Sequence, residues 1–213
     1  MRIKHICFDL DGVLINSLEI MEMSWFEAAQ KYNLDINFNS YKKYIGIPFY
    51  DILNKLEIKE NTWEEIKETY DEVSTREINN IKKYDGVNDL FEYLTSKNIT
   101  FSIFTSKTRK RTNEIIAKQF ENIKFEMVLC PEDLPDYEGK PSGYGLKQIM
   151  NNLKISKDNF LYVGDTLHDI ECAKNADVSF VFADWGYGNL NISLESAQNI
   201  SQFISILEKK IKN

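Results

Sequence analysis

Five short runs of apolar residues recur along the chain. Each run is nearly continuous in apolar and aromatic side chains, which is typical of strands buried on both faces of a parallel sheet. A strand with one face in water would instead alternate between apolar and polar residues. The expected strands are Ile3 to Phe8, Thr100 to Phe104, Glu126 to Leu129, Asn159 to Val163 and Val178 to Phe182.

Helical periodicity fills the intervals between the later strands. Strands that alternate with helices favour right-handed βαβ units. The pattern therefore predicts an α/β fold with a doubly wound parallel sheet. The expected helices are Val87 to Lys97, Thr108 to Phe120, Tyr144 to Leu153, Asp169 to Asn175 and about Ile200 to Ile211.

One long interval after the first strand breaks this alternation. It contains no good strand pattern, and apolar residues such as Met21 and Trp25 repeat at helical spacing. We therefore predict a helical cap domain at residues 15–83, inserted into a core domain of residues 1–14 and 84–213. Most of the cap's many aromatic side chains are expected to form its own core.

The composition narrows the choice of partners and location. The formal net charge is −7 and no block of Lys or Arg stands out, so neither nucleic acid nor a membrane surface is an expected partner. No apolar run approaches the roughly 18 residues of a membrane span, and the N-terminus reads as a strand, not a signal peptide. The 3 cysteines lack metal or redox spacing, which favours reduced thiols in a cytoplasmic protein.

The first strand ends in two carboxylates. Asp9 and Asp11 would point to the same side if the strand continues, and Gly12 then permits a sharp turn that exposes backbone N–H groups. Two like charges so close stay ionised only with a cation or a shared proton. The alternative is a loop of solvated acids, because Asp-Gly is also a turn signal.

The fourth strand also delivers acids at its carboxyl end. Asp165 lies in the strand-to-helix turn, and Asp169 lies near the helix start, where Asp is also a good cap. If the first strand is central, the strand order reverses there, and Asp9, Asp11, Asp165 and Asp169 converge in one crevice. An all-oxygen cluster favours a hard cation, with Mg²⁺ as the leading choice.

Two further strand ends bring groups that suit a phosphate. Thr105 and Ser106 follow the second strand, and hydroxyls and amides at a helix start bind phosphate well. Lys140 opens a helix after the third strand and could supply a fixed positive charge. Alone, each signal is weak, because Thr-Ser pairs often start helices and lysines are usually solvated. Their position at consecutive strand ends strengthens the set.

With these residues in this order, the chain resembles the haloacid dehalogenase (HAD) superfamily of phosphohydrolases. The resemblance implies a Rossmann-like core with a helical cap, as in the phosphoglycolate-phosphatase-like and β-phosphoglucomutase-like branches. The motifs span the chain and are specific for the superfamily, but they do not indicate the substrate. They are Asp9-Leu10-Asp11-Gly12, Thr105, Lys140-Pro141, and Gly164-Asp165 with Asp169.

The resemblance also implies roles for these residues. Asp9 would attack phosphorus and form an aspartyl-phosphate, and Asp11 would protonate the leaving alcohol and then activate water. Mg²⁺ would be held by the Asp9 side chain, the Asp11 backbone carbonyl and Asp165, while Asp169 would assist through water or orient Lys140. The phosphoryl oxygens would be held by Thr105, Lys140 and backbone amides in the Leu10 to Gly12 turn and near Ser106.

Several segments add to this pattern or depart from it. The segment Tyr44 to Pro48, with Gly46 at its centre, resembles the cap loop that the family lowers over its substrate. Lys42, Lys43 or Tyr44 could touch the leaving group, although solvated lysines are the alternative. Gly143 stands where a second proline is frequent, which puts the rigidity of that loop in doubt. His168 is expected at the surface, and the loop 184–188 resembles one of phosphoglycolate-phosphatase-like members.

The sequence predicts a Mg²⁺-dependent phosphatase acting on a small phosphorylated metabolite, with three alternatives of unequal weight beside it. A phosphosugar mutase would use the same residues, and the cap would decide the outcome by excluding water. A dehalogenase is disfavoured because Asp11 is present, and an inactive binding protein is disfavoured because no catalytic position is lost. The substrate, which could be phosphoglycolate, a sugar phosphate, a nucleotide or pyrophosphate, and the oligomeric state stay open.

Overall fold

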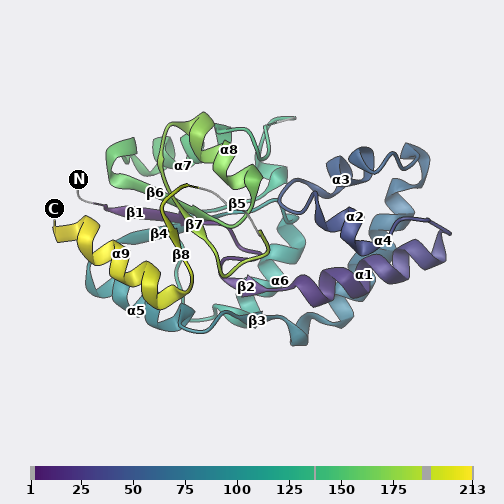
Figure 1. Cartoon of the computed structure of the whole chain (residues 1–213), viewed down its shortest axis with the longest axis horizontal. Coiled ribbons are helices and arrows are strands. Elements are labelled where there is room, and N and C mark those ends of the chain that lie inside the picture. Colours follow the sequence, from purple (N-terminus) through teal and green to yellow (C-terminus); the bar gives the residue numbers. More distant parts are fainter. Residues whose placement is uncertain (1–2, 137, 189–192, 213) are drawn as a thin grey trace.

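A six-stranded parallel sheet forms the centre of the computed structural model, which describes residues 3–136, 138–188 and 193–212 (Figure 1). The strand order is β5-β4-β1-β6-β7-β8, so the order reverses beside β1. The predicted doubly wound α/β fold is confirmed. The strands are β1 (His5–Phe8), β4 (Thr100–Phe104), β5 (Val128–Leu129), β6 (Phe160–Gly164), β7 (Ser179–Ala183) and β8 (Ser196–Ala197).

Helices cover both faces of the sheet, and this burial explains the continuous apolar runs. Ile6 and Phe8 of β1 belong to one buried cluster, while Cys7 between them belongs to another. That alternation follows from the two-residue period of a strand. Helices α5 (Val87–Ser96) and α9 (Ile200–Lys212) pack on the first face, with α6 (Arg109–Gln119), and α7 (Tyr144–Leu153) and α8 (Leu167–Ala176) on the second.

Two details of the core differ from the sequence prediction. The sheet contains β8, which was not predicted, because two residues of Ser and Ala carry no apolar run. Helix α8 begins at Leu167 and not at Asp169, because Thr166 caps it: the Asp169 N–H donates to Thr166 Oγ1 over 3.3 Å. The terminal residues of the predicted core domain, 1, 2 and 213, lie outside the described residues.

Four helices at one end of the molecule form a separate cluster around large aromatic side chains (Figure 1). Trp25, Tyr41 and Tyr70 are buried in it, whereas Phe26 is 65% exposed and does not belong to this core. The partition of the chain at residues 15–83 stays a prediction. The helices are α1 (Leu18–Lys31), α2 (Phe38–Lys42), α3 (Phe49–Lys55) and α4 (Trp63–Arg76).

A small antiparallel ladder joins the two chain segments that connect the helical end with the sheet. It pairs β2 (Ile15–Asn16) with β3 (Lys82–Lys83), so the prediction of an interval without strands was wrong at its two ends. Short 3₁₀ turns complete the structure at Glu60–Thr62, Ile78–Asn80, Pro131–Asp133 and Lys157–Asn159.

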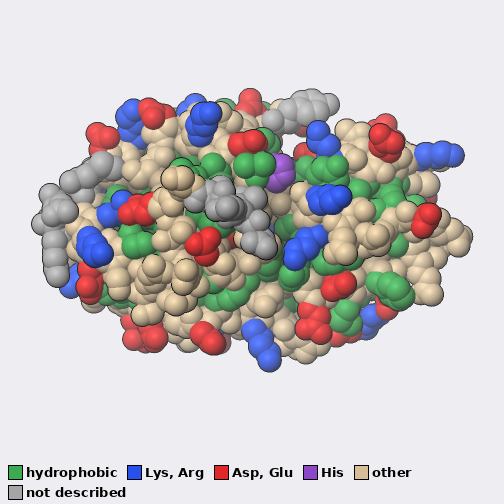
Figure 2. Space-filling model, viewed as in Figure 1, with side chains coloured by type: hydrophobic (Ala, Val, Ile, Leu, Met, Phe, Trp, Pro, Cys, Tyr) green, Lys and Arg blue, Asp and Glu red, His purple; other side chains and the backbone are tan. Residues whose placement is uncertain are grey.

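Charged side chains of both signs are interspersed over the face shown in Figure 2, without a large field of one sign. Within the described ranges, no helix combines the length and the apolar character needed to cross a bilayer. The expectations about nucleic acid, membranes and cytoplasmic location stay predictions.

Candidate active site

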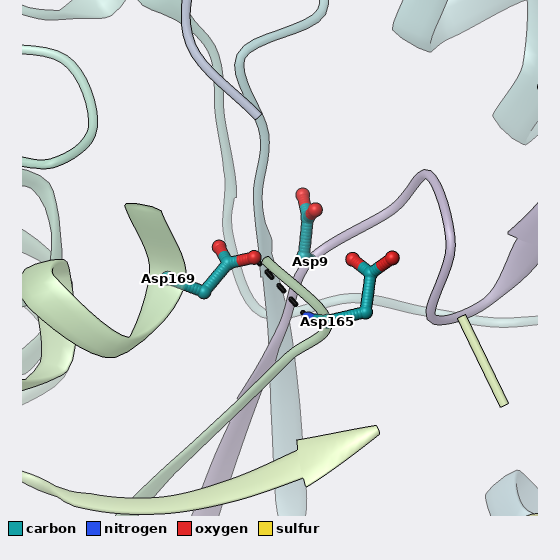
Figure 3. A group of neighbouring side chains, drawn as sticks. All are labelled: Asp9, Asp165 and Asp169. Carbon is teal, nitrogen blue, oxygen red and sulfur yellow. Dashed lines mark hydrogen bonds between the residues drawn. The ribbon is translucent and has the colours of Figure 1, made fainter. Parts of the chain in front are cut away.

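Three buried carboxylates meet where β1 and β6 end side by side. The Asp9 N–H donates to Val163 O over 2.9 Å, which continues the β1–β6 pairing by one residue and places Asp9 beside the start of the Asp165 turn. Asp9, Asp165 and Asp169 each offer an oxygen within 4.8 Å of the others (Figure 3). The Asp11 side chain is not part of this group, and the Asp11 backbone carbonyl as a metal ligand stays a prediction.

Lys140 neutralises part of this negative charge. Its Nζ lies 2.8 Å from Asp9 Oδ1 and 2.8 Å from Asp169 Oδ1, and its side chain is fully buried. Burial lowers the pKa of Lys140, but the two carboxylates outweigh this and hold the pKa above its usual value, so the ammonium stays charged. The solvated-lysine alternative is therefore excluded for Lys140.

Asp169 has both carboxylate oxygens occupied by protein donors. Oδ1 accepts from Lys140 and from Tyr162 OH at 2.5 Å, and Oδ2 accepts from Thr166 Oγ1 at 2.6 Å and from the Asp165 N–H at 3.2 Å. Burial raises the pKa of Asp169, but Lys140 and the hydrogen bonds lower it below the usual value. Of the two roles predicted for Asp169, this arrangement favours orienting Lys140 over binding a metal directly.

Asp165 differs because one of its oxygens has no protein donor. Oδ2 accepts from the Tyr187 N–H at 2.6 Å, whereas Oδ1 is buried without a hydrogen-bond partner among the described residues. Burial, with Asp169 and Asp9 nearby, raises the pKa of Asp165 well above its usual value. A buried carboxylate oxygen without a donor, beside a second carboxylate, suits a hard divalent cation.

Gly12 and Gly186 make the close packing around Asp165 possible. A Cβ on Gly12, whose φ is +84°, would lie 2.0 Å from Asp165 Oδ2, and a Cβ on Gly186 would lie 2.4 Å from Asp165 Cβ. The sharp turn predicted at Gly12 is therefore present. Because Gly12 and Gly186 have no side chains, both segments can pack directly against Asp165.

The Asp9 carboxylate is held in one orientation. Its Oδ1 accepts from the Leu10 N–H over 2.7 Å and pairs with Lys140, while Oδ2 has no hydrogen bond to the described part of the chain. Burial raises the pKa of Asp9 to about 7, an effect that Lys140 opposes and Asp169 reinforces. Three buried acids against one lysine leave an excess of negative charge that a cation would balance.

Asp11 is held by residues that the sequence analysis did not identify. Ser17 Oγ donates a short hydrogen bond to Asp11 Oδ1, and Lys107 Nζ lies 3.3 Å from Asp11 Oδ2. Ser17 lies in the segment leading into α1, and its backbone N–H donates to Tyr187 OH over 2.7 Å. Only two features of the sequence could have pointed to these contacts. Lys107 directly follows Thr105-Ser106, and the 184–188 loop resembles one of phosphoglycolate-phosphatase-like members.

Thr105 and Ser106 lie at the carboxyl end of β4, as predicted. Thr105 is buried and its Oγ1 accepts from the Lys107 N–H over 3.1 Å. Ser106 Oγ donates to Gly46 O over 2.7 Å, so the predicted cap loop touches the core at this point. Gly46 has φ +112°, and a Cβ there would lie 2.8 Å from Thr166 Oγ1.

The remaining expectations met different outcomes. His168 is the second residue of α8 and is partly exposed beside Gly46, with Nδ1 buried and unpartnered among the described residues. Lys42 and Lys43 are not among the described residues that line the cavity next to Asp9. At Gly143, a Cβ would lie 2.4 Å from the Ala176 backbone N, which explains why a larger residue is absent from this position.

A cavity of about 80 Å³ adjoins these groups between the sheet and the helical end. Its polar wall contains Asp9, Asp11 and Thr105 from the core. The helical end contributes apolar and aromatic side chains, Tyr41, Ile45, Ile47, Phe49, Ile52 and Tyr70. The arrangement can hold a small polar molecule against Asp9 while limiting its contact with water.

A model of the haloacid dehalogenase-like hydrolase family matches residues 6–183, which is most of the chain. The chain belongs to this family. Its predicted identity as a HAD-type enzyme is thereby confirmed. A divalent metal is general in such enzymes, and the acidic group at Asp9 and Asp165 provides suitable ligands.

Named relatives and solved structures agree with this assignment. The pyrophosphatase PpaX of Oceanobacillus iheyensis is 27% identical over 192 residues, covering 90% of this chain and 88% of that protein. PpaX of Bacillus cereus is 26% identical, covering 87% and 85%. A predicted phosphoglycolate phosphatase from Haemophilus somnus 129PT has a TM-score of 0.82 at 21% identity, covering 97% and 98% of the two chains. A hydrolase from Pseudomonas syringae has a TM-score of 0.84 at 20% identity, with 97% and 98% covered.

Proposed function

We propose that the protein is a Mg²⁺-dependent phosphatase that hydrolyses a small phosphorylated metabolite through an aspartyl-phosphate on Asp9. The observation that carries the proposal is the geometry of Asp9. One oxygen is fixed by Lys140 and the Leu10 N–H, and the other is without a protein partner in the described chain. A carboxylate held this way is oriented for in-line attack.

In the first step, Asp9 Oδ2 attacks phosphorus and the bond from phosphorus to the leaving oxygen breaks. Asp11 donates its proton to the leaving oxygen, so that the product departs as a neutral hydroxyl. Ser17 and Lys107 hold the Asp11 carboxyl in place. Thr105 Oγ1, Lys140 and backbone N–H groups after Asp9 hold the transferring oxygens.

In the second step, water attacks the phosphorus of the aspartyl-phosphate and Asp11 accepts the proton. The bond from phosphorus to Asp9 Oδ2 breaks, which releases inorganic phosphate and restores the free carboxylate. Mg²⁺ would be held by Asp9, Asp165 and the Asp11 carbonyl, and it would supply charge neutralisation between the carboxylate and an anionic substrate. Asp169 positions Lys140 and is not a direct ligand in this proposal.

The names of the relatives support hydrolysis as the reaction. Pyrophosphatases and a predicted phosphoglycolate phosphatase both transfer phosphoryl groups to water. These names favour a phosphatase over a phosphosugar mutase, and the presence of Asp11 disfavours a dehalogenase. The small cavity supports a substrate with few atoms beyond its phosphoryl group.

The test is phosphate release from a panel of small phosphate esters and pyrophosphate, with Mg²⁺ and with chelator. Wild type should require Mg²⁺, and Asp9→Asn and Asp11→Asn should each lose at least about 10²-fold of the rate. The exposed Asp158→Asn is the matched control and should keep full activity. Turnover retained in Asp9→Asn would exclude the covalent mechanism.

A further inference from the structure

Positively charged side chains from both the core and the cap line the cavity beyond the reacting carboxylates. Lys107 and Arg111 lie in or before α6 of the core, and Lys67 lies in α4 of the cap. Apart from the two acids that follow β1, the only acidic side chain among the described lining residues is Asp71. This part of the wall therefore has three cations and one anion.

Arg111 is the most deeply buried of these cations, with 3% of the residue exposed. One of its terminal nitrogens donates to Ser74 O over 2.6 Å and to Ser74 Oγ over 2.8 Å. The other donates to Thr75 Oγ1 over 3.0 Å and pairs with Glu114. Its Nε is buried and has no hydrogen-bond partner in the described ranges. A buried donor without an acceptor costs free energy, and an anion in the cavity would recover it.

Lys67 is the second cation of this wall, but it is paired with Asp71 one helical turn away. Lys107 is committed to Asp11. Arg111 is therefore the group with spare hydrogen-bonding capacity, and Lys67 adds charge beside it. In a small cavity such charges favour an oxyanion over a neutral hydroxyl group.

We propose that Arg111, assisted by Lys67, binds an oxyanion on the leaving group of the substrate, either a carboxylate or a second phosphoryl group. This inference rests on the proposed function, because it assumes that the transferring phosphoryl group occupies the Asp9 end. A substrate with a neutral leaving group leaves the buried Arg111 Nε without an acceptor, so it is disfavoured relative to an anionic one. Arg111 thus determines specificity and takes no part in the bond-breaking step.

The experiment compares substrates that differ at one group. Phosphoglycolate carries a carboxylate where 2-hydroxyethyl phosphate carries a neutral hydroxymethyl group, and pyrophosphate tests a phosphoryl oxyanion. We expect Arg111→Gln to lose roughly 10- to 100-fold in kcat/KM on an anionic substrate and less than about 3-fold on 2-hydroxyethyl phosphate. Arg111→Lys should recover part of the loss, and Lys110→Gln, the exposed neighbour on α6, should behave as wild type.

Equal losses on both kinds of substrate would overturn the proposal, because they would mean that Arg111 only fastens α4 to the core. Calorimetric titration of the same three compounds in Mg²⁺ separates this outcome from failure of the proposed function. If no phosphate is released, a binding preference for the anionic compounds that Arg111→Gln abolishes still supports the subsite. Equal binding of all three compounds by wild type overturns it. If Arg111→Gln does not fold, Lys67→Gln and Arg111→Lys serve in the same comparison.

Discussion

Lys140 Nζ lies 2.8 Å from Asp169 Oδ1, and neither side chain is exposed to solvent. Asp169 is itself fixed by the Thr166 cap of α8 and by the Tyr162 hydroxyl of β6. The Lys140 ammonium group that contacts Asp9 is therefore oriented by residues of β6 and of the start of α8. The position of the proposed nucleophile depends on a chain of buried contacts and not on Asp9 alone.

Replacing Lys140 tests this dependence. Lys140→Met keeps the length of the side chain but leaves Asp9 and Asp169 buried without their cation. We expect stability to fall by roughly 3 kcal/mol, and phosphate release to fall by at least about 10²-fold. Urea unfolding and a phosphate-release assay measure the two effects. Lys147→Met, at an exposed position on α7, is the control, and a variant at Lys140 with wild-type stability would contradict the argument.

Asp165 gives a prediction in which two effects have opposite signs. Because Oδ1 is buried without a donor in the described chain, Asp165→Asn should be at least as stable as wild type in chelator. Mg²⁺ at about 100 times its Kd should add roughly 2.7 kcal/mol to wild type and almost nothing to the variant. Thermal unfolding with and without Mg²⁺ measures both.

The control for this experiment is Asp184→Asn, an exposed acid that follows β7. It should respond to Mg²⁺ as wild type does. Equal Mg²⁺ stabilisation of Asp165→Asn would remove Asp165 from the proposed ligand set.

Tyr187 connects the loop after β7 with the segment that leads into α1. Its hydroxyl accepts from the Ser17 N–H over 2.7 Å, while its own N–H donates to Asp165 Oδ2. The hydroxyl also lies 3.1 Å from Ser17 Oγ and donates to Ile15 O over 3.4 Å. Tyr187→Phe removes these three hydroxyl contacts and keeps the backbone one, so we expect a loss of about 1–2 kcal/mol in stability. The stabilisation by Mg²⁺ should be unchanged because the backbone donor to Asp165 remains.

Denaturant unfolding of Tyr187→Phe in the presence and absence of Mg²⁺ checks both parts of this prediction. Tyr144→Phe, which removes a hydroxyl from a side chain of an exposed residue, is the control. A Tyr187→Phe variant that loses the Mg²⁺ response would show that the hydroxyl also controls the metal site.

The fold and the acids at the strand ends could be predicted because both depend on local sequence. A fully buried strand such as β6 needs a continuous apolar run, and the topology of a doubly wound sheet then brings Asp9 and Asp165 together. The strands β2 and β8 have two residues each and contain Asn or Ser, so no periodicity was available to detect them.

Contacts between distant segments explain the residues that the sequence did not reveal. Ser17 and Tyr187 are 170 positions apart, and Arg111 and Ser74 are 37 apart, so neither pair forms a motif. The Asp11 side chain, predicted as the acid and base, is held by Ser17 and Lys107, and no motif in the sequence links these two residues to Asp11.

His5 gives a prediction about stability and pH that does not involve the metal site. Its ring is fully buried in β1, stacks on Phe160 with a centroid distance of 5.3 Å, and contacts Ser102 Oγ and Thr100 Oγ1. Burial lowers the pKa of His5 from 6.5 to about 4. Between these two pKa values the unfolded chain binds a proton that the folded protein does not. The contribution of neutral His5 to the free energy of unfolding is therefore fully present above pH 6.5 and falls as the pH drops from 6.5 towards 4.

From pH 7 to pH 5, this difference in His5 protonation should cost about 2 kcal/mol. His5→Gln keeps a polar side chain between Thr100 and Ser102 but cannot titrate, so its stability should fall less over the same range. The raised pKa of Asp9 acts in the opposite direction, but it is present in both proteins and cancels in the comparison. Urea unfolding of both proteins at pH 7, 6 and 5 gives the difference directly. Parallel pH profiles for His5→Gln and wild type would mean that His5 is protonated in the folded protein, with its charge balanced by groups other than its two hydroxyl partners.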